Sequence, residues 1–273
     1  MGLFDVFKKK DCEICGKEVG MFGYKKLEDG EICKDCVKLL SPWFDDRRHS
    51  TVEQIKQQLV YREKNREALQ SFRASQVIGE NYKMYVEEVN GVPTRFLITD
   101  ADSYMDENPD IIAFEDLLSC TIDIDTDDTE LMQEDKEGNR VSYNPPRFET
   151  QYDFYVNMQI GNNPYFDDIR FKLNSGSVTL KSRGGTSGGF LGLSFSSGPV
   201  DMSSAYERER HQKYTQMCQQ IEYVVQRSRM APQAAAPVAE PAQPQAPAGP
   251  KFCQNCGAPA EGGKFCQHCG SPF

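Results

Sequence analysis

The sequence lacks three features that would point to familiar functions. No apolar run approaches the roughly 18 residues that a membrane-spanning helix needs, and no charged-then-apolar leader precedes the body. The three histidines stand beside no plausible nucleophile, which gives nucleophilic catalysis little support. Positive charge is not in excess, since 31 basic residues face 41 acidic ones. We therefore expect a cytoplasmic, non-enzymatic protein for which nucleic acid is a disfavoured partner.

Cysteine, in contrast, occurs in a clear pattern. Eight of the ten cysteines form four C-x-x-C pairs, a spacing typical of metal ligands in a reducing compartment. In the head, seventeen residues separate the pair Cys12 and Cys15 from the pair Cys33 and Cys36. Zinc prefers four tetrahedral ligands, and each pair can supply two sulfurs from one side. These four residues are the predicted first zinc site.

The tail contains an internal repeat. Residues 251–259 read K-F-C-Q-N-C-G-A-P and residues 264–272 read K-F-C-Q-H-C-G-S-P. Their cysteines form the predicted second zinc site: Cys253, Cys256, Cys266 and Cys269. Four thiolates leave no open position for water, so both zinc ions are expected to be structural. Iron accepts the same ligand set, and thioredoxin-like redox use of a C-x-x-C pair is the other alternative.

Between the head cysteines, the pattern predicts a knuckle, a hairpin and a helix. Gly16 allows the first turn to curl, Asp29-Gly30 is a hairpin turn, and residues 37–40 look helical before Pro42. This is the order of a treble-clef finger.

Two longer helices are expected. Ser50 and Glu53 have capping-box spacing at the start of a helix that we expect to end near Ser75. Its charged run, residues 62–67, is predicted to be solvated on most faces. Ser203 or Ser204 is predicted to cap a second helix, whose apolar stripe runs to Val225 and must cover something apolar.

The segment between these helices alternates as half-buried strands do. Asn90-Gly91 indicates a hairpin, and six or seven antiparallel strands are expected. Leu118, Cys120, Ile122 and Ile124 are predicted to face inward, opposite Ser119, Thr121 and Asp123. Cys120 and, on the second helix, Cys218 are interpreted as small core residues rather than ligands.

A sheet that ends in one amphipathic helix, with the segment 111–119 (I-I-A-F-E-D-L-L-S), resembles pleckstrin-homology-like (PH-like) domains and related bacterial barrels. The resemblance implies an α+β fold with an antiparallel PH-like barrel closed by its C-terminal helix. Such domains bind proteins, peptides or lipids, and the fold does not select among them. The tail repeat, for its part, resembles short zinc-ribbon modules of bacterial and archaeal proteins.

The complete order resembles a family of bacterial proteins without an established activity, which have an N-terminal four-cysteine finger, a sheet domain and often a zinc-ribbon tail. The resemblance implies a cytoplasmic zinc-binding protein. It rests on these residues of the head: Cys12, Cys15, Gly16, Lys17, Lys26, Leu27, Asp29, Gly30, Ile32, Cys33 and Cys36.

These observations divide the chain into five parts. The clearest boundary is an Ala/Pro/Gln-rich stretch that leaves nothing to bury and predicts a disordered tether. The predicted parts are a zinc finger (1–48), a connecting helix (49–75), a PH-like sheet domain with its terminal helix (76–229), the linker (230–250) and a zinc ribbon (251–273).

Three weaker signals have competing interpretations. Acidic residues from Asp123 to Glu134 have calcium-loop spacing, but Asp128 occupies the position that needs glycine, so a solvated acidic hairpin is favoured. Residues 1–10 suit peripheral membrane contact, although a frayed terminus is favoured. The glycine-rich residues 183–192 lack the ending of a phosphate-binding loop, so a flexible loop is favoured.

The sequence therefore predicts an adaptor with two structural zinc ions, whose middle domain recognises a protein, a peptide or a lipid group. The alternative is a nucleic-acid-binding regulator that acts through its fingers. The neutral head and the acidic middle offer few phosphate contacts to such a regulator.

Overall fold

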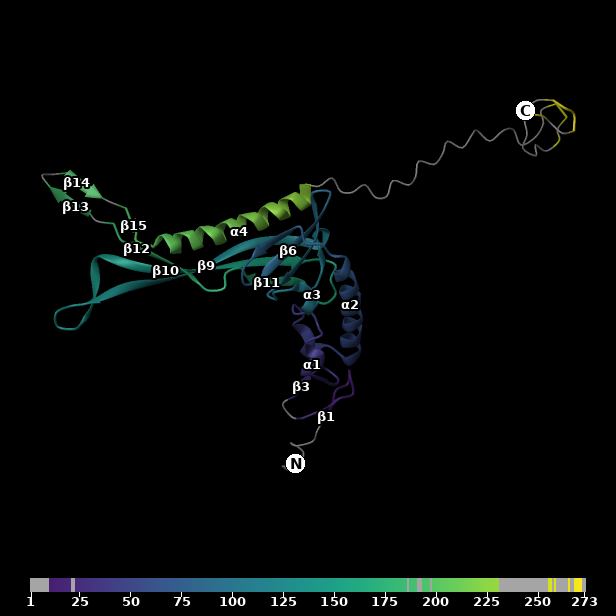
Figure 1. Cartoon of the computed structure of the whole chain (residues 1–273), viewed down its shortest axis with the longest axis horizontal. Coiled ribbons are helices and arrows are strands. Elements are labelled where there is room, and N and C mark those ends of the chain that lie inside the picture. The colour runs from purple at the N-terminus through teal and green to yellow at the C-terminus, as the bar shows by residue number, and fades with distance from the viewer. Residues whose placement is uncertain are drawn as a thin grey trace. The chain divides into compact units, whose positions relative to one another are not determined.

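A computed structural model describes residues 10–20, 23–185, 187–190, 193–196 and 198–230, and in the tail residues 255, 256, 258, 265 and 268–271 (Figure 1). The chain divides into two compact units, Met1–Met230 and Ala231–Phe273. The predicted membrane contact at residues 1–10 and the predicted linker fall outside the described residues, except at Lys10 and Met230.

Short elements come first along the first unit, followed by long strands and a final long helix. The helices are α1 (Lys34–Val37), η2 (Asp46–His49), α2 (Val52–Ser71), α3 (Tyr104–Glu107), η3 (Phe114–Asp116) and α4 (Ala205–Met230). The strands of the head are β1 (Lys10–Asp11), β2 (Glu18–Val19), β3 (Tyr24–Lys26) and β4 (Glu31–Cys33). Those of the larger sheets are β5 (Gln76–Gly79), β6 (Lys83–Val89), β7 (Val92–Thr99), β8 (Ile112–Ala113), β9 (Leu117–Glu134), β10 (Arg140–Ile160), β11 (Asp168–Lys172), β12 (Val178–Arg183) and β15 (Val200–Asp201). A separate hairpin joins β13 (Ser187–Phe190) and β14 (Leu193–Ser196).

Helix α2 begins one residue later than predicted. Its capping box uses Thr51, whose hydroxyl accepts from Gln54 N at 3.2 Å while Gln54 Oε1 accepts from Thr51 N at 2.8 Å. The Ser50 hydroxyl instead donates to Asp46 O in the preceding turn. The helix also ends earlier, at Ser71, because the fully buried Phe72 takes an extended conformation.

The strands form two antiparallel sheets rather than one barrel. Strands β5 to β8 make the first sheet in chain order, with Asn90 and Gly91 at positive φ in the β6–β7 turn, as a hairpin turn requires. In the second sheet, β10 pairs with β9 on one side and with β11 and β12 on the other. No described sheet closes on itself. Eleven strands are described between residues 76 and 201, so the prediction of six or seven was too low.

Strand β9 corrects two expectations. Leu118 is 64% exposed and Ile124 43% exposed, whereas Cys120 and Ile122 are half-buried against the core. Leu118 lies at the start of the strand beside a register shift in the β9–β10 pairing, and Leu117 is buried in its place.

The acidic residues with calcium-loop spacing, 123–134, all lie within strand β9. The glycine-rich segment expected to be a loop forms β13 over residues 187–190.

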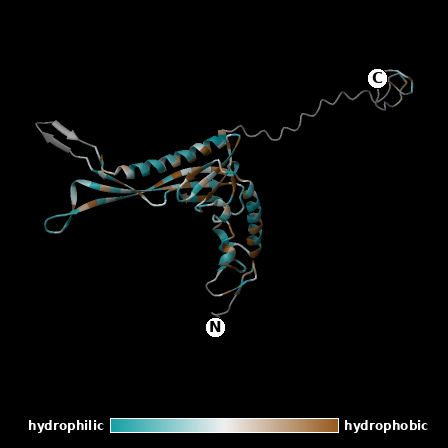
Figure 2. Ribbon diagram, in the orientation of Figure 1, coloured by the Kyte–Doolittle hydropathy of each residue, from teal (hydrophilic) through white to brown (hydrophobic). Residues whose placement is uncertain are grey.

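The main core lies between the two sheets and α4. Ser204 caps α4, since its hydroxyl accepts from Glu207 N at 3.1 Å and Glu207 Oε2 accepts from Ser204 N at 2.7 Å. Figure 2 shows α4 as mostly hydrophilic with hydrophobic turns, as a helix with one buried stripe should be. The helix therefore covers an apolar surface, as predicted. Its buried residues are Tyr214, Cys218, Ile221, Val224 and Val225.

Candidate metal centre

Two turns of the head position the cysteine pairs. The first links β1 to β2, where Gly16 N donates to Cys12 O at 2.7 Å and Gly16 takes a φ of 71°. This left-handed conformation favours glycine and directs Cys12 and Cys15 to the same side. The second pair follows the β3–β4 hairpin, with Cys33 as the N-cap of α1 and Cys36 inside that helix. Knuckle, hairpin and helix thus occur in the predicted order, although α1 begins and ends three residues earlier than predicted.

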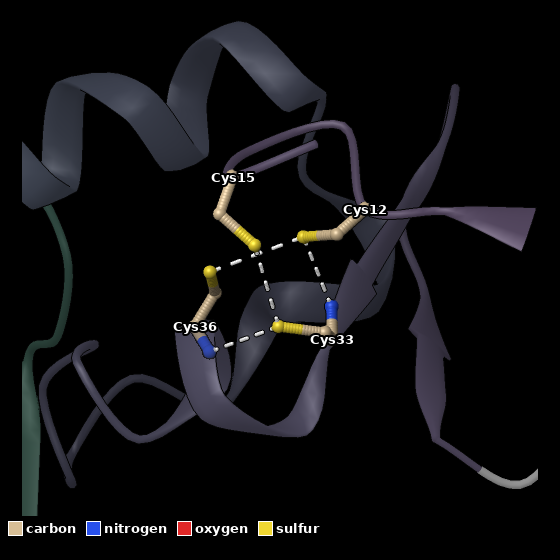
Figure 3. A group of neighbouring side chains, drawn as sticks. All are labelled: Cys12, Cys15, Cys33 and Cys36. Atoms are coloured by element: carbon tan, nitrogen blue, oxygen red, sulfur yellow. Dashed lines mark hydrogen bonds between the residues drawn. The ribbon is translucent and has the colours of Figure 1, made fainter. Parts of the chain in front are cut away.

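The four sulfur atoms converge on one point (Figure 3). All lie within 4.8 Å of one another, with Cys12 Sγ 3.9 Å from Cys36 Sγ and Cys15 Sγ 3.8 Å from Cys33 Sγ. Four sulfurs placed tetrahedrally about 2.3 Å from a zinc ion have edges of about 3.8 Å. The cluster therefore has the dimensions of a zinc site before any ion is considered.

Backbone amides support the sulfur atoms. Cys33 N donates to Cys12 Sγ at 3.2 Å, and Cys36 N donates to Cys33 Sγ at 3.4 Å. Burial acts to raise the pKa of the Cys12 thiol, but hydrogen bonds from the backbone outweigh it and lower this pKa to about 6. Burial and the neighbouring sulfurs raise the pKa of Cys36. Cys12 is thus ready to ligate as a thiolate, and a bound cation would favour the thiolate at the other three.

The site is closed on its protein side. Cys12, Cys33 and Cys36 are buried, and Cys15 is the exposed member. Lys17 Nζ and Asp35 form an ion pair of 3.0 Å across the two turns, at the surface. Because four thiolates would fill a tetrahedral coordination sphere, the arrangement can hold a metal but offers no position for an activated water.

The predicted tail site is described only in part. Cys253 and Cys266 lie outside the described residues, whereas Cys256 and Cys269 lie within them. Asn255 Nδ2 of the first repeat donates to Ser271 Oγ of the second at 2.9 Å and lies 3.9 Å from Cys269 Sγ. Gly270 takes a φ of 74°, close to that of Gly16 after the corresponding cysteine of the head. The two repeats thus meet, and the second zinc site remains a prediction.

A polar group that was not predicted from the sequence joins the head to the first sheet. Arg62 and Asn65, in the run expected to be solvated, are buried, whereas the neighbouring Glu63 and Arg66 are exposed. Arg62 pairs with Asp110 at 2.7 Å and donates to Leu39 O at 3.2 Å, while Ser41 Oγ donates to Asp110 at 2.7 Å.

Helical spacing gave a signal for this group. The buried residues of α2 recur at intervals of three and four, which places the two polar ones on the buried face. That face consists of Ile55, Gln58, Arg62, Asn65 and Leu69.

Comparisons with known proteins give one match. Residues 10–58 match a family described as Domain of unknown function (DUF4428), a range that contains all four head cysteines and the first turns of α2. No curated protein and no solved structure gave a significant match. Among the described residues, no helix combines the length and the apolar character needed to cross a bilayer.

Proposed function

We propose that residues 10–58 bind one structural zinc ion through Cys12, Cys15, Cys33 and Cys36, and that the tail binds a second. The observation that carries the first site is the pair of sulfur distances, 3.8 and 3.9 Å, which match the edge of a zinc–thiolate tetrahedron. The internal repeat and the meeting of Asn255 with Ser271 support the second site.

The wider role that we propose is that of a non-enzymatic adaptor. In this role the sheets and α4 form a PH-like module that recognises a protein or peptide. A cavity of about 800 Å³ supports a protein partner, because it lies where the head, α2 and α3 meet and presents the exposed apolar side chains of Leu39 and Met105. Arg62, which pairs with the buried Asp110, also donates to the carbonyl oxygens of Leu39 and Asn108, two residues that line this cavity.

Elemental analysis of full-length protein purified without chelators tests the metal assignment. We expect two zinc ions per chain, one after Cys33→Ser and one after Cys266→Ser. Cys218→Ser is the matched control, because this cysteine lies in the core on α4, and it should retain both ions. Metal content that stays at two in both ligand variants would refute the assignment.

The adaptor role is tested by affinity purification of the intact chain beside a Leu39→Asp, Met105→Asp variant. We expect one partner that the intact chain captures and the variant loses while keeping two zinc ions. Val60→Asp is the control, because Val60 is 58% exposed but does not line the cavity. Equal capture by all three proteins would exclude this surface.

A further inference from the structure

Two arginines face each other on neighbouring strands of the second sheet. Arg147 of β10 and Arg183 of β12 are direct partners in the antiparallel register. Like charges directly opposite each other destabilise a sheet unless something compensates them. The pair therefore requires an explanation.

A third arginine on the same face of the sheet, Arg170, serves as a comparison for this pair. Arg170 lies over the ring of Tyr155 at 4.2 Å, and its guanidinium is neutralised by Asp123 at 2.8 Å and Asp125 at 3.6 Å. Arg147 lies over the ring of Tyr143 in the same way, at 4.1 Å. Among the described residues, however, no acidic side chain pairs with Arg147 or Arg183.

The other basic residues of this face are also neutralised. Lys172 pairs with Asp153 at 2.8 Å, and Lys181 pairs with Glu149 at 3.6 Å. The two arginines thus stand as an uncompensated double positive charge beside cations that all have acidic partners.

Both arginine side chains are partly buried. The Nε atoms of both side chains are buried without a hydrogen-bond acceptor. Next to them, Gly184 N donates to Pro146 O at 2.7 Å, and a Cβ on Gly184 would lie only 3.2 Å from Pro146 Cγ. The terminal Nη atoms of both side chains, in contrast, are accessible to solvent. They form no hydrogen bond in the described part of the chain, so they are available to a ligand.

We propose that Arg147 and Arg183 bind the phosphate group of a small soluble compound. Two planar guanidinium forks offer more donors than the two oxygens of one carboxylate can accept, whereas a phosphate monoester offers three oxygens. Its charge of about −1.5 to −2 at neutral pH also matches the two positive charges. This site goes beyond the proposed recognition of a protein or peptide, and neither proposal depends on the other.

The charge of the module favours a small ligand over a polyanionic surface. Residues 80–202 contain 23 acidic and nine basic residues. An anionic membrane or a nucleic acid would bring many phosphates against this acidic module and be repelled, whereas a small compound brings one phosphate to the basic pair.

The test is a calorimetric titration of full-length, zinc-loaded protein with inorganic phosphate at fixed ionic strength. We expect one saturable site, weakened at least tenfold by Arg147→Gln and by Arg183→Gln, and less weakened by Arg147→Lys, which keeps the charge. Arg170→Gln is the matched control, because it removes an arginine stacked on tyrosine whose charge already has acidic partners, and it should bind phosphate like the wild type. Acetate should give no saturable heat.

Several results would overturn the proposal. They are the absence of saturable phosphate binding in the folded wild type, equal weakening by Arg170→Gln, or acetate binding as strong as that of phosphate. Binding to phosphatidic acid vesicles that Arg147→Gln abolishes would replace the soluble compound by a lipid. Zinc content and far-ultraviolet circular dichroism are measured on every variant, so a failed phosphate site with two zinc ions retained leaves the metal assignment intact.

Discussion

The head and the sheet module achieve a buried interior in different ways. The buried cluster of the head and the start of α2 has seven members. Three are the predicted ligands Cys12, Cys33 and Cys36, and the others are four aliphatic residues, one of which, Ile55, belongs to α2. The core of the sheet module instead contains large aromatic side chains such as Phe96 and Phe154, both fully buried. Small domains bury too little apolar surface to be stable alone. From this difference we expect the head to depend on metal and the sheet module on packing.

Removal of the metal should expose this difference most strongly. Structural zinc contributes on the order of 10 kcal/mol to the folding of finger peptides. We expect a strong chelator to abolish hydrogen-exchange protection in β3, β4 and α1, while amides of β6, β7 and β10 keep theirs. Mass spectrometry of exchanging full-length protein measures both regions in one sample.

Phe154→Ala is the reciprocal control for that experiment. It should lower protection in β10 without changing zinc content, because the side chain is fully buried in the main core. Protection of β3 and β4 that survives complete metal removal would contradict the proposed dependence of the head on zinc.

Arg62→Ala tests the connection between the two regions. It leaves Asp110 buried without its cation, a change that costs about 3 to 5 kcal/mol. We expect a corresponding loss in the free energy of unfolding, measured by denaturant titration with the fluorescence of Trp43, the single tryptophan. Arg66→Ala on the same helix should cost about 0 to 1 kcal/mol, because its ion pair with Glu63 is exposed. Equal effects would show that the buried pair does not join the regions.

The two regions also differed in how far the sequence could predict them. The head follows local rules: two C-x-x-C turns, a glycine that allows positive φ and a short hairpin specify the convergence of Cys12, Cys15, Cys33 and Cys36. In the tail the same rules predict a site, of which the structure describes Cys256 and Cys269.

The sheet module follows long-range pairing, which the sequence does not contain in readable form. The exposure of Leu118 depends on a register shift in its pairing with the distant residues of β10, and the burial of Arg62 depends on its distant partner Asp110. Alternation along the strand does not reveal the register shift, and the helical spacing that places Arg62 on the buried face of α2 does not reveal its partner. Likewise, the pairing of Arg147 with Arg183 follows from the register of β10 and β12 and has no local sequence signal.

The stability of the two regions should also respond differently to acid, and this effect is expected to be smaller than those above. Burial acts to raise the pKa of Glu87 in β6, but hydrogen bonds from Arg95 Nε at 2.6 Å and Arg73 N at 2.8 Å outweigh it and lower this pKa. The folded state therefore binds this proton less readily than the unfolded state, whose pKa is about 4.3. The resulting stabilisation is present above that value and is lost as the pH falls through the folded pKa.

Glu87→Gln should thus cost about 1 to 2 kcal/mol at pH 7, since it removes a hydrogen-bonded charge. It should also flatten the decline in stability between pH 5 and pH 3, measured by exchange of β6 and β7 amides. Glu63→Gln, in an exposed pair, should change neither quantity. The head should respond to acid by another route, because protonation of the cysteine ligands releases zinc. If β6 and the head lost protection at the same pH in both Glu87 forms, acid would act on the whole first unit through the metal alone, and the two regions would not be separately stabilised.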